Sequence, residues 1–237
     1  LQPRPGPPHE TEFTPFSVVA FTSADGYDWQ YSATIANWDS AGTPTYWGPN
    51  ENDVALLSDN RTLVCVLRMD GDSSCATESY KDYYAAYSSD NGLSWSAPRR
   101  IDGAGCARPR LLKLASGPLL LSGGRLCVEN ASGVFAWVNE DGMGGIGGGA
   151  PRAEWVKHSI SYQHNRLWRG DPIYLFDERV NVSDAWQTLS YTTMMSTGPD
   201  SLTITYQRFF PYGPNCSVKS WPGPNVNFAI QVRVLRT

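Results

Sequence analysis

The run SSDNGLSW at residues 88–95 decides how the chain is expected to fold. Asp90 can accept backbone N–H bonds inside a tight hairpin turn, and Gly92 allows a positive φ where a side chain would clash. Trp95 then begins the next strand with a large ring to bury. These spaced positions predict one specific turn between two strands, against the alternative of a chance Asn-Gly hairpin. Weaker copies of the pattern stand at residues 23–29 (SADGYDW) and 139–142 (NEDG).

Short apolar segments lie on both sides of this turn and recur about every 8–12 residues, which is typical of all-β proteins. No helical apolar period lasts for three turns, so we expect no long helix. Roughly a dozen strands are expected, enough for about three sheets of four strands. The segments are residues 16–21, 31–36, 54–57, 63–67, 83–87, 110–114, 119–122, 134–138, 155–162, 173–176, 188–195, 202–207 and 228–234.

The chain is long enough for one large domain or two small ones. Of 237 residues, 41% are hydrophobic and 18% are charged, so a sizeable core is possible. We expect a Pro-rich extended lead-in at residues 1–15 and one domain at residues 16–237. A net charge of −4 argues against a nucleic-acid partner. The sequence contains no apolar stretch of about 18 residues, so we expect no membrane span. The glycine-rich residues 144–149 lack the Lys-Ser/Thr of a phosphate-binding loop, and we expect no cofactor.

Four Asn-X-Ser/Thr glycosylation signals indicate an extracellular, cell-surface or secretory-pathway protein. They begin at Asn60, Asn130, Asn181 and Asn215. Asn60 falls in a predicted hairpin turn, where a glycan would be tolerated.

The five cysteines match no zinc-binding spacing, and no metal site is expected. In an oxidising compartment we expect the pairs Cys65–Cys75 and Cys106–Cys127, each of which closes a short loop. Cys216 is then free or pairs with a group outside this chain.

The segment around the first turn resembles the middle of the exo-α-sialidase (neuraminidase) family, whose β-propellers carry such turns as Asp-boxes (BNR repeats). The resemblance rests on GPNE at residues 48–51, a strand that ends in Arg68, and the turn at residues 88–95. The stretch from residue 106 to 125 and the unit from residue 188 to 206 are also similar to this family. The resemblance implies a sialidase-like six-bladed propeller, of which this chain supplies only part, the C-terminal portion of the catalytic domain.

The resemblance also implies a chemistry, because sialidases are glycosidases with a tyrosine nucleophile. Their substrate carries a carboxylate on the reacting carbon, which would repel a carboxylate nucleophile, whereas a phenol is neutral. Tyr191 would be the nucleophile and Glu51 its base, since a phenol with a pKa of about 10 needs such a neighbour. Arg68 would bind the substrate carboxylate through its planar, permanently charged fork. The alternative is a loop glutamate and a strand-end arginine without catalytic roles.

Other parts of the family's site are less easily placed. Arg125 is the nearest candidate for a second carboxylate-binding arginine, although it equally fits an ion pair on a blade surface. Nothing before Glu51 matches the family's remaining arginine or its acid/base aspartate. These groups would come from another chain, from another segment of this one, or not at all. The His164-Asn165 pair, expected in a loop after a strand, either binds a glycan hydroxyl or only caps that loop.

Two functions follow. The first is a secreted or surface exo-α-sialidase-like glycoside hydrolase that cleaves terminal sialic acid from sialylated glycans. The alternative is a catalytically inactive sialidase-like propeller, a glycan-binding or structural module of an extracellular assembly. A propeller of another substrate class is a third reading, because Asp-boxes occur in several propeller families.

Overall fold

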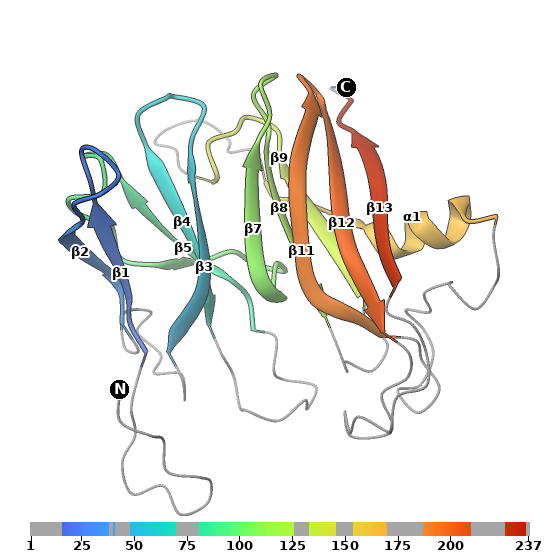
Figure 1. Ribbon diagram of the computed structural model, residues 1–237, viewed down its shortest axis with the longest axis horizontal. Coiled ribbons are helices and arrows are strands. Elements are labelled where there is room, and N and C mark those ends of the chain that lie inside the picture. Colours follow the sequence, from blue (N-terminus) through green and yellow to red (C-terminus); the bar gives the residue numbers. More distant parts are fainter. Residues whose placement is uncertain are drawn as a thin grey trace, which may run out of the picture.

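The computed structural model describes residues 16–37, 40, 48–69, 81–125, 133–145, 154–169, 187–209 and 226–235. Within these residues, strands form four antiparallel sheets, accompanied by one short helix. Figure 1 shows the sheets side by side along the long axis, with β1 and β2 at one end and β11 to β13 at the other. The expected all-β class is therefore confirmed.

Each sheet is a meander of strands that follow one another along the chain. The first sheet pairs β1 (Val18–Thr22) and β2 (Gln30–Ala36). The second contains β3 (Pro49–Leu56), β4 (Leu63–Met69), β5 (Tyr84–Ser88) and β6 (Arg99–Arg100). The third contains β7 (Ala107–Lys113), β8 (Leu119–Arg125), β9 (Gly133–Asn139) and β10 (Val156–Ser159). The fourth contains β11 (Gln187–Gly198), β12 (Ser201–Phe209) and β13 (Val226–Arg233).

Apolar cores fill the spaces between neighbouring sheets. Strand β4 shows the principle, because its successive side chains point to opposite faces. Val64 and Val66 belong to the core shared with the third sheet, whereas Cys65 and Leu67 face the first sheet. A third core joins the third and fourth sheets through residues such as Leu120 and Ile204. The second and third sheets are therefore covered by apolar cores on both faces. The four described sheets pack one against the next, and none of them closes on itself.

The turn at residues 88–95 is closed by the side chains that predict it. Asp90 accepts the backbone N–H of Ser94 at 2.9 Å and the hydroxyl of Ser88 at 2.8 Å. Hydrogen bonds from Ser94 and Ser88 lower the pKa of Asp90 to about 2. Gly92 has a φ of 85°, and its carbonyl accepts the Trp95 indole N–H at 3.2 Å. Most of the bonds that close the turn come from its own residues, and the Ser32 hydroxyl on β2 adds a hydrogen bond to the Gly92 carbonyl at 2.9 Å.

The weaker copy at residues 23–29 has the same bonding. Asp25 accepts the backbone N–H groups of Tyr27 at 2.8 Å and Asp28 at 3.0 Å. The Trp29 indole N–H again reaches the carbonyl of the glycine, Gly26, at 3.2 Å. The turn at residues 139–142 differs, because there Asn139 accepts from Gly144 N at 2.7 Å.

One secondary-structure expectation is wrong. Residues 160–162 were expected to continue a strand and His164 to lie in a loop, but both belong to helix α1 (Ile160–Leu167). Ser159 caps this helix by accepting the backbone N–H of Tyr162 at 3.1 Å, which satisfies a donor that the first turn leaves unpaired. The helix has only eight residues, too few for the apolar period to appear in the sequence. It is not long and apolar enough to cross a membrane, and no other helix occurs in the described ranges.

The expected disulfides are also not formed. Cys65 and Cys106 are both free and buried, and burial raises their thiol pKa values to about 12 and about 11. Each packs as a small apolar side chain in an inter-sheet core, which is a common role for cysteine. Several other expectations lie outside the described residues: the lead-in at 1–15, the segment at 173–176, the cysteines Cys75, Cys127 and Cys216, and the glycosylation signals at Asn130, Asn181 and Asn215.

Candidate functional site

Glu51 is the centre of a group of charged and polar side chains on the strands β3, β4, β7 and β11. It lies near the start of β3, where a register shift between Pro49 and Asn52 interrupts the pairing with β4. Such an irregularity turns a side chain away from its regular direction. The Glu51 side chain is 21% exposed, so its charge must be compensated by close partners.

Three donors surround the Glu51 carboxylate. The Tyr191 hydroxyl donates to Oε1 at 2.6 Å. The Arg68 guanidinium donates to Oε2 at 2.6 Å, and the backbone N–H of Arg108 donates to the same oxygen at 2.7 Å. The structure thus brings together Glu51, Arg68 and Tyr191, three of the four residues proposed from the sequence for catalysis and substrate binding.

The stacking of the sheets explains why such distant residues meet. Glu51 and Arg68 lie on the neighbouring strands β3 and β4 of the second sheet. Tyr191 belongs to the fourth sheet, on β11. Strand β7 lies between β3 and β11 (Figure 1) and contributes Arg108 from the third sheet. Strands from three successive sheets therefore converge on the same carboxylate.

The fourth expected residue, Arg125, which was proposed as a second ligand of the substrate carboxylate, contacts other groups in the described structure. Its Nε donates to the carbonyl of Gly105 at 2.5 Å, and its guanidinium lies 5.3 Å from the ring centre of Phe135. Among the described residues no hydrogen bond or ion pair joins Arg125 to Glu51 or Tyr191. In this structure Arg125 supports the segment that precedes β7.

A buried tyrosine supports the same segment. The Tyr83 hydroxyl donates to the carbonyl of Ala107 at 3.0 Å, and the side chain is fully buried. Gly123 makes room for this contact, because a Cβ there would lie 2.4 Å from the Tyr83 hydroxyl and 2.9 Å from the Ala107 carbonyl. The buried Tyr83 side chain therefore positions the backbone just before Arg108, whose N–H donates to Glu51.

The electrostatics of the pair follow from these contacts. Burial alone would raise the pKa of Glu51, but hydrogen bonds from Tyr191 and Arg68, together with the Arg68 charge, lower it below its ordinary value. The hydrogen bond to Glu51 raises the pKa of Tyr191, and burial adds to this. At neutral pH the resting pair is therefore a carboxylate that accepts a hydrogen bond from a neutral phenol, the arrangement of a base with its nucleophile.

This arrangement predicts a pH dependence of stability. Because the pKa of Glu51 is lowered in the folded protein, its contribution is present above the ordinary glutamate pKa of about 4.3 and is lost as the pH falls through the folded value. We expect the free energy of unfolding of Glu51→Gln to fall less steeply than that of the wild type as the pH decreases below about 4.3. Urea unfolding at a series of pH values measures this. Glu140→Gln, at an exposed turn position, is the control, and equal slopes for wild type and Glu51→Gln would contradict the prediction.

Sequence reasoning missed Arg108. The residue before a proline has a restricted backbone, and the sequence ARPR at residues 107–110 contains that signal. It also missed Asp53, whose carboxylate accepts the Leu111 N–H at 2.8 Å and so ties β3 to β7. No local pattern marks this contact, because the two residues are far apart in the sequence.

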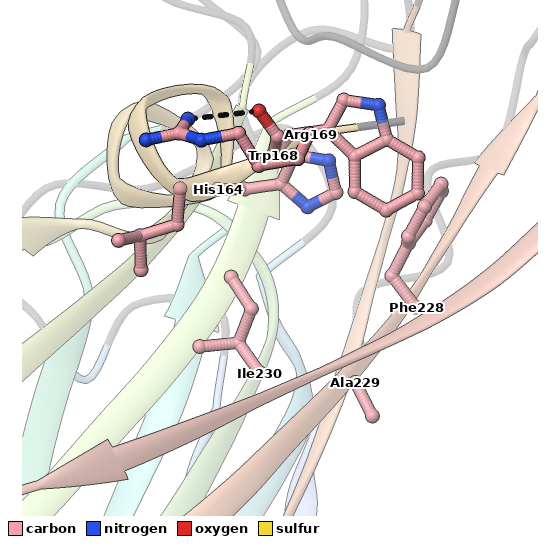
Figure 2. Close-up of a pocket in the computed structure, with 7 residues that line it drawn as sticks. His164, Trp168, Arg169, Phe228, Ala229 and Ile230 are labelled. Carbon is pink, nitrogen blue, oxygen red and sulfur yellow. Dashed lines mark hydrogen bonds between the residues drawn. The ribbon is translucent and has the colours of Figure 1, made fainter. Parts of the chain in front are cut away.

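His164 lies in a separate place, on the side of α1 that packs against β13, with its ring centre 4.8 Å from that of Phe228. Its Nδ1 lies 2.7 Å from the Tyr206 hydroxyl, and its ring stacks on Trp168 with centres 5.3 Å apart. Figure 2 shows a small apolar pocket beside it, with Trp168 and Phe228 against the histidine ring and Ile230 below. Strand β13 is the far edge of the fourth sheet from β11, so this pocket is not part of the Glu51 site. Buried among aromatic rings, His164 acts as a core residue.

No group of three or more histidine, cysteine, aspartate or glutamate side chains that could hold a metal occurs in the described parts of the chain. At the Glu51 site, the described residues bring together a phenol, a carboxylate and two arginines.

Comparisons with known proteins support the fold but give no information about the activity. No family model matches the chain, and no curated protein matches it. Among solved structures, it is similar to a crystal structure of an unknown function protein from Dyadobacter fermentans DSM 18053, with 17% sequence identity and a TM-score of 0.56. The match covers 90% of this chain and 45% of that chain, so this chain spans less than half the length of that protein. At this identity the chain is shown to share an arrangement of β-sheets with that protein.

Proposed function

We propose that this chain carries part of the active site of an exo-α-sialidase-like glycoside hydrolase. The observation that supports it most is the 2.6 Å hydrogen bond from the Tyr191 hydroxyl to Glu51, whose other oxygen is held by Arg68. A tyrosine bonded to a compensated carboxylate, with an arginine beside them, is the set that a tyrosine-nucleophile glycosidase requires.

In the proposed reaction, the Tyr191 oxygen attacks the anomeric carbon of a terminal sialic acid while its proton passes to Glu51. The bond to the aglycone breaks, and the leaving oxygen takes a proton from an acid that we have not identified among the described residues. Water then displaces Tyr191 from the anomeric carbon and passes one of its protons to the conjugate base of that acid, while Glu51 returns its proton to the Tyr191 oxygen. Two displacements at one carbon retain its configuration.

Arg68 has two tasks in this proposal. It holds Glu51 in place in the resting protein, and it binds the carboxylate of the incoming sugar. A substrate carboxylate would share the positive charge that now lowers the pKa of Glu51. Glu51 would then become a stronger base when substrate is bound, which favours proton transfer from Tyr191 at that moment.

We further infer that the four sheets belong to a six-bladed propeller that is completed by another segment or another chain. The stacking of sheets buried on both faces supports this, as does a match that covers 45% of a longer solved protein. The missing acid and any further arginine would come from that part. Sialylated glycans are the proposed partners, and the extracellular space or secretory pathway is the proposed location.

The proposed location predicts a glycan at Asn60. This residue is exposed in the turn between β3 and β4, with a φ of 53°. After secretion from eukaryotic cells, Asn60→Gln should lose the mass of one N-linked glycan, as measured before and after treatment with a glycosidase that removes such glycans. Asn91→Gln, at an exposed turn position without a glycosylation signal, should keep the wild-type mass pattern. An Asn60 peptide found unmodified in the secreted protein would contradict the prediction.

The reaction is tested with the native protein and a fluorogenic α-sialoside. We expect release of the fluorophore and retention of configuration. The methyl ester of the same sialoside should not be cleaved, because it has no negatively charged carboxylate for Arg68 to bind. A fluorinated sialosyl fluoride should label the protein, and peptide mass analysis should place the label on Tyr191. If the native protein neither cleaves the sialoside nor becomes labelled at Tyr191, the proposal is wrong.

A binding or structural module is the second candidate, and the position of Arg125 favours it. Arg125 donates to the carbonyl of Gly105, and in this candidate it is a structural residue and not a ligand of the substrate carboxylate. This candidate predicts sialoside binding in calorimetry that Arg68→Gln abolishes, without any hydrolysis or labelling of Tyr191.

A further inference from the structure

Arg108 occupies a strained position in β7. The pairing of β7 with β8 shifts register between Ala107 and Arg110, so the strand bulges at this point. Arg108 has a φ of 33°, a left-handed value that residues with side chains rarely adopt. It also precedes Pro109, which restricts its backbone further. Such strain persists only where the surroundings enforce it, and it gathers at functional sites.

The backbone of Arg108 is held by the site itself. Its N–H donates to Glu51 Oε2 at 2.7 Å. The carbonyl just before it, on Ala107, accepts the buried Tyr83 hydroxyl at 3.0 Å. With Arg68 on the same oxygen, Glu51 Oε2 is fully engaged, and Oε1 is left for Tyr191. The bulge therefore sets the orientation of the carboxylate.

The side chain of Arg108 contacts the other member of the pair. Its guanidinium carbon lies 5.2 Å from the centre of the Tyr191 ring, a distance at which a cation and an aromatic face attract each other. Arg108 is exposed, so this contact is not imposed by burial. One residue thus touches Glu51 through its backbone and Tyr191 through its side chain.

We propose that Arg108 is a positioning residue of this site, which orients the Glu51 carboxylate through its bulged backbone and holds the Tyr191 ring through its guanidinium. The inference rests on the proposed function only for the claim that Tyr191 reacts. Its electrostatic part does not require turnover. A nearby guanidinium stabilises a phenolate more than a phenol, and Arg108 acts in that direction on the pKa of Tyr191, opposing Glu51 and burial.

The variant that separates the two contacts is Arg108→Gly. Glycine adopts positive φ without strain, so the backbone N–H to Glu51 is kept and only the guanidinium is lost. Arg108→Lys restores a cation. Arg61→Gly is the matched control, because Arg61 is an exposed arginine in the turn at the opposite end of β3 from Glu51.

The direct measurement is the ionisation of residue 191. With 3-nitrotyrosine incorporated there, a single phenol titrates near neutral pH and is followed by its visible absorption. We expect the midpoint to move to higher pH in Arg108→Gly, to lie between the two in Arg108→Lys, and to stay unchanged in Arg61→Gly. A midpoint in Arg108→Gly equal to that of the parent, or an equal shift in Arg61→Gly, would overturn the proposal.

Kinetics on the unlabelled protein supply the second measurement. Arg108→Gly should lose about tenfold in kcat for the α-sialoside, with little change in KM, because a displaced pair reacts more slowly than an aligned one. An unchanged kcat would overturn the positioning role. If no variant or wild type turns over sialoside while the midpoint of residue 191 still shifts, the hydrolase proposal fails and the effect of Arg108 on Tyr191 stands.

Discussion

Tyr191→Phe is expected to lower kcat for a fluorogenic α-sialoside by at least about 100-fold. The change removes one oxygen, which is both the proposed nucleophile and the donor of the 2.6 Å hydrogen bond to Glu51. Arg68 still holds Glu51 through Oε2, so the binding of substrate, measured as its Kd, should change far less than the rate. Initial rates across a range of sialoside concentrations measure kcat, and calorimetry measures Kd.

Tyr27→Phe is the matched control for this prediction. It removes the same atom from a tyrosine that is 89% exposed in the turn at residues 23–29, and it should leave kcat unchanged. A Tyr191→Phe protein with the full wild-type rate would rule out tyrosine as the nucleophile. The Glu51 and Arg68 pair would then be a structural ion pair between β3 and β4.

Trp137→Ala should lower the free energy of unfolding by about 3–5 kcal/mol. Trp137 lies on β9 with 1% of its surface exposed, in the core between the second and third sheets. Its ring centre is 6.2 Å from those of both Tyr83 and Phe135. Removing the indole opens a cavity that the rigid strands cannot fully close. Urea unfolding followed by circular dichroism gives the difference.

The control is Trp29→Ala, which removes the same group from a position with 61% of its surface exposed. We expect that variant to lose much less stability than Trp137→Ala. Because Tyr83 packs on Trp137 and also supports Ala107 beneath Arg108, Trp137→Ala should lower kcat at temperatures where the protein is still folded. Equal unfolding free energies for the two variants would contradict the assignment of this core.

The all-β class and most of the strands are predictable from the sequence, because they depend on local signals. Asp90 and Gly92 form a turn with contacts that span only a few residues, so the pattern alone predicts it. The alternation in β4 places Val66 and Arg68 on the same face, toward the third sheet. The short helix α1 escaped prediction because its eight residues carry too few apolar positions.

By itself, the sequence determined the hairpin turns, the alternating strands and the identity of Glu51, Arg68 and Tyr191 as candidates, since each depends on nearby residues or on the order of motifs. Only the tertiary structure decided that a bulged Arg108 joins that group while Arg125 turns to a backbone carbonyl. The physical reason is that these contacts are made between sheets, where the stacking of β3, β7 and β11 sets the distances. No pattern within one strand carries that information.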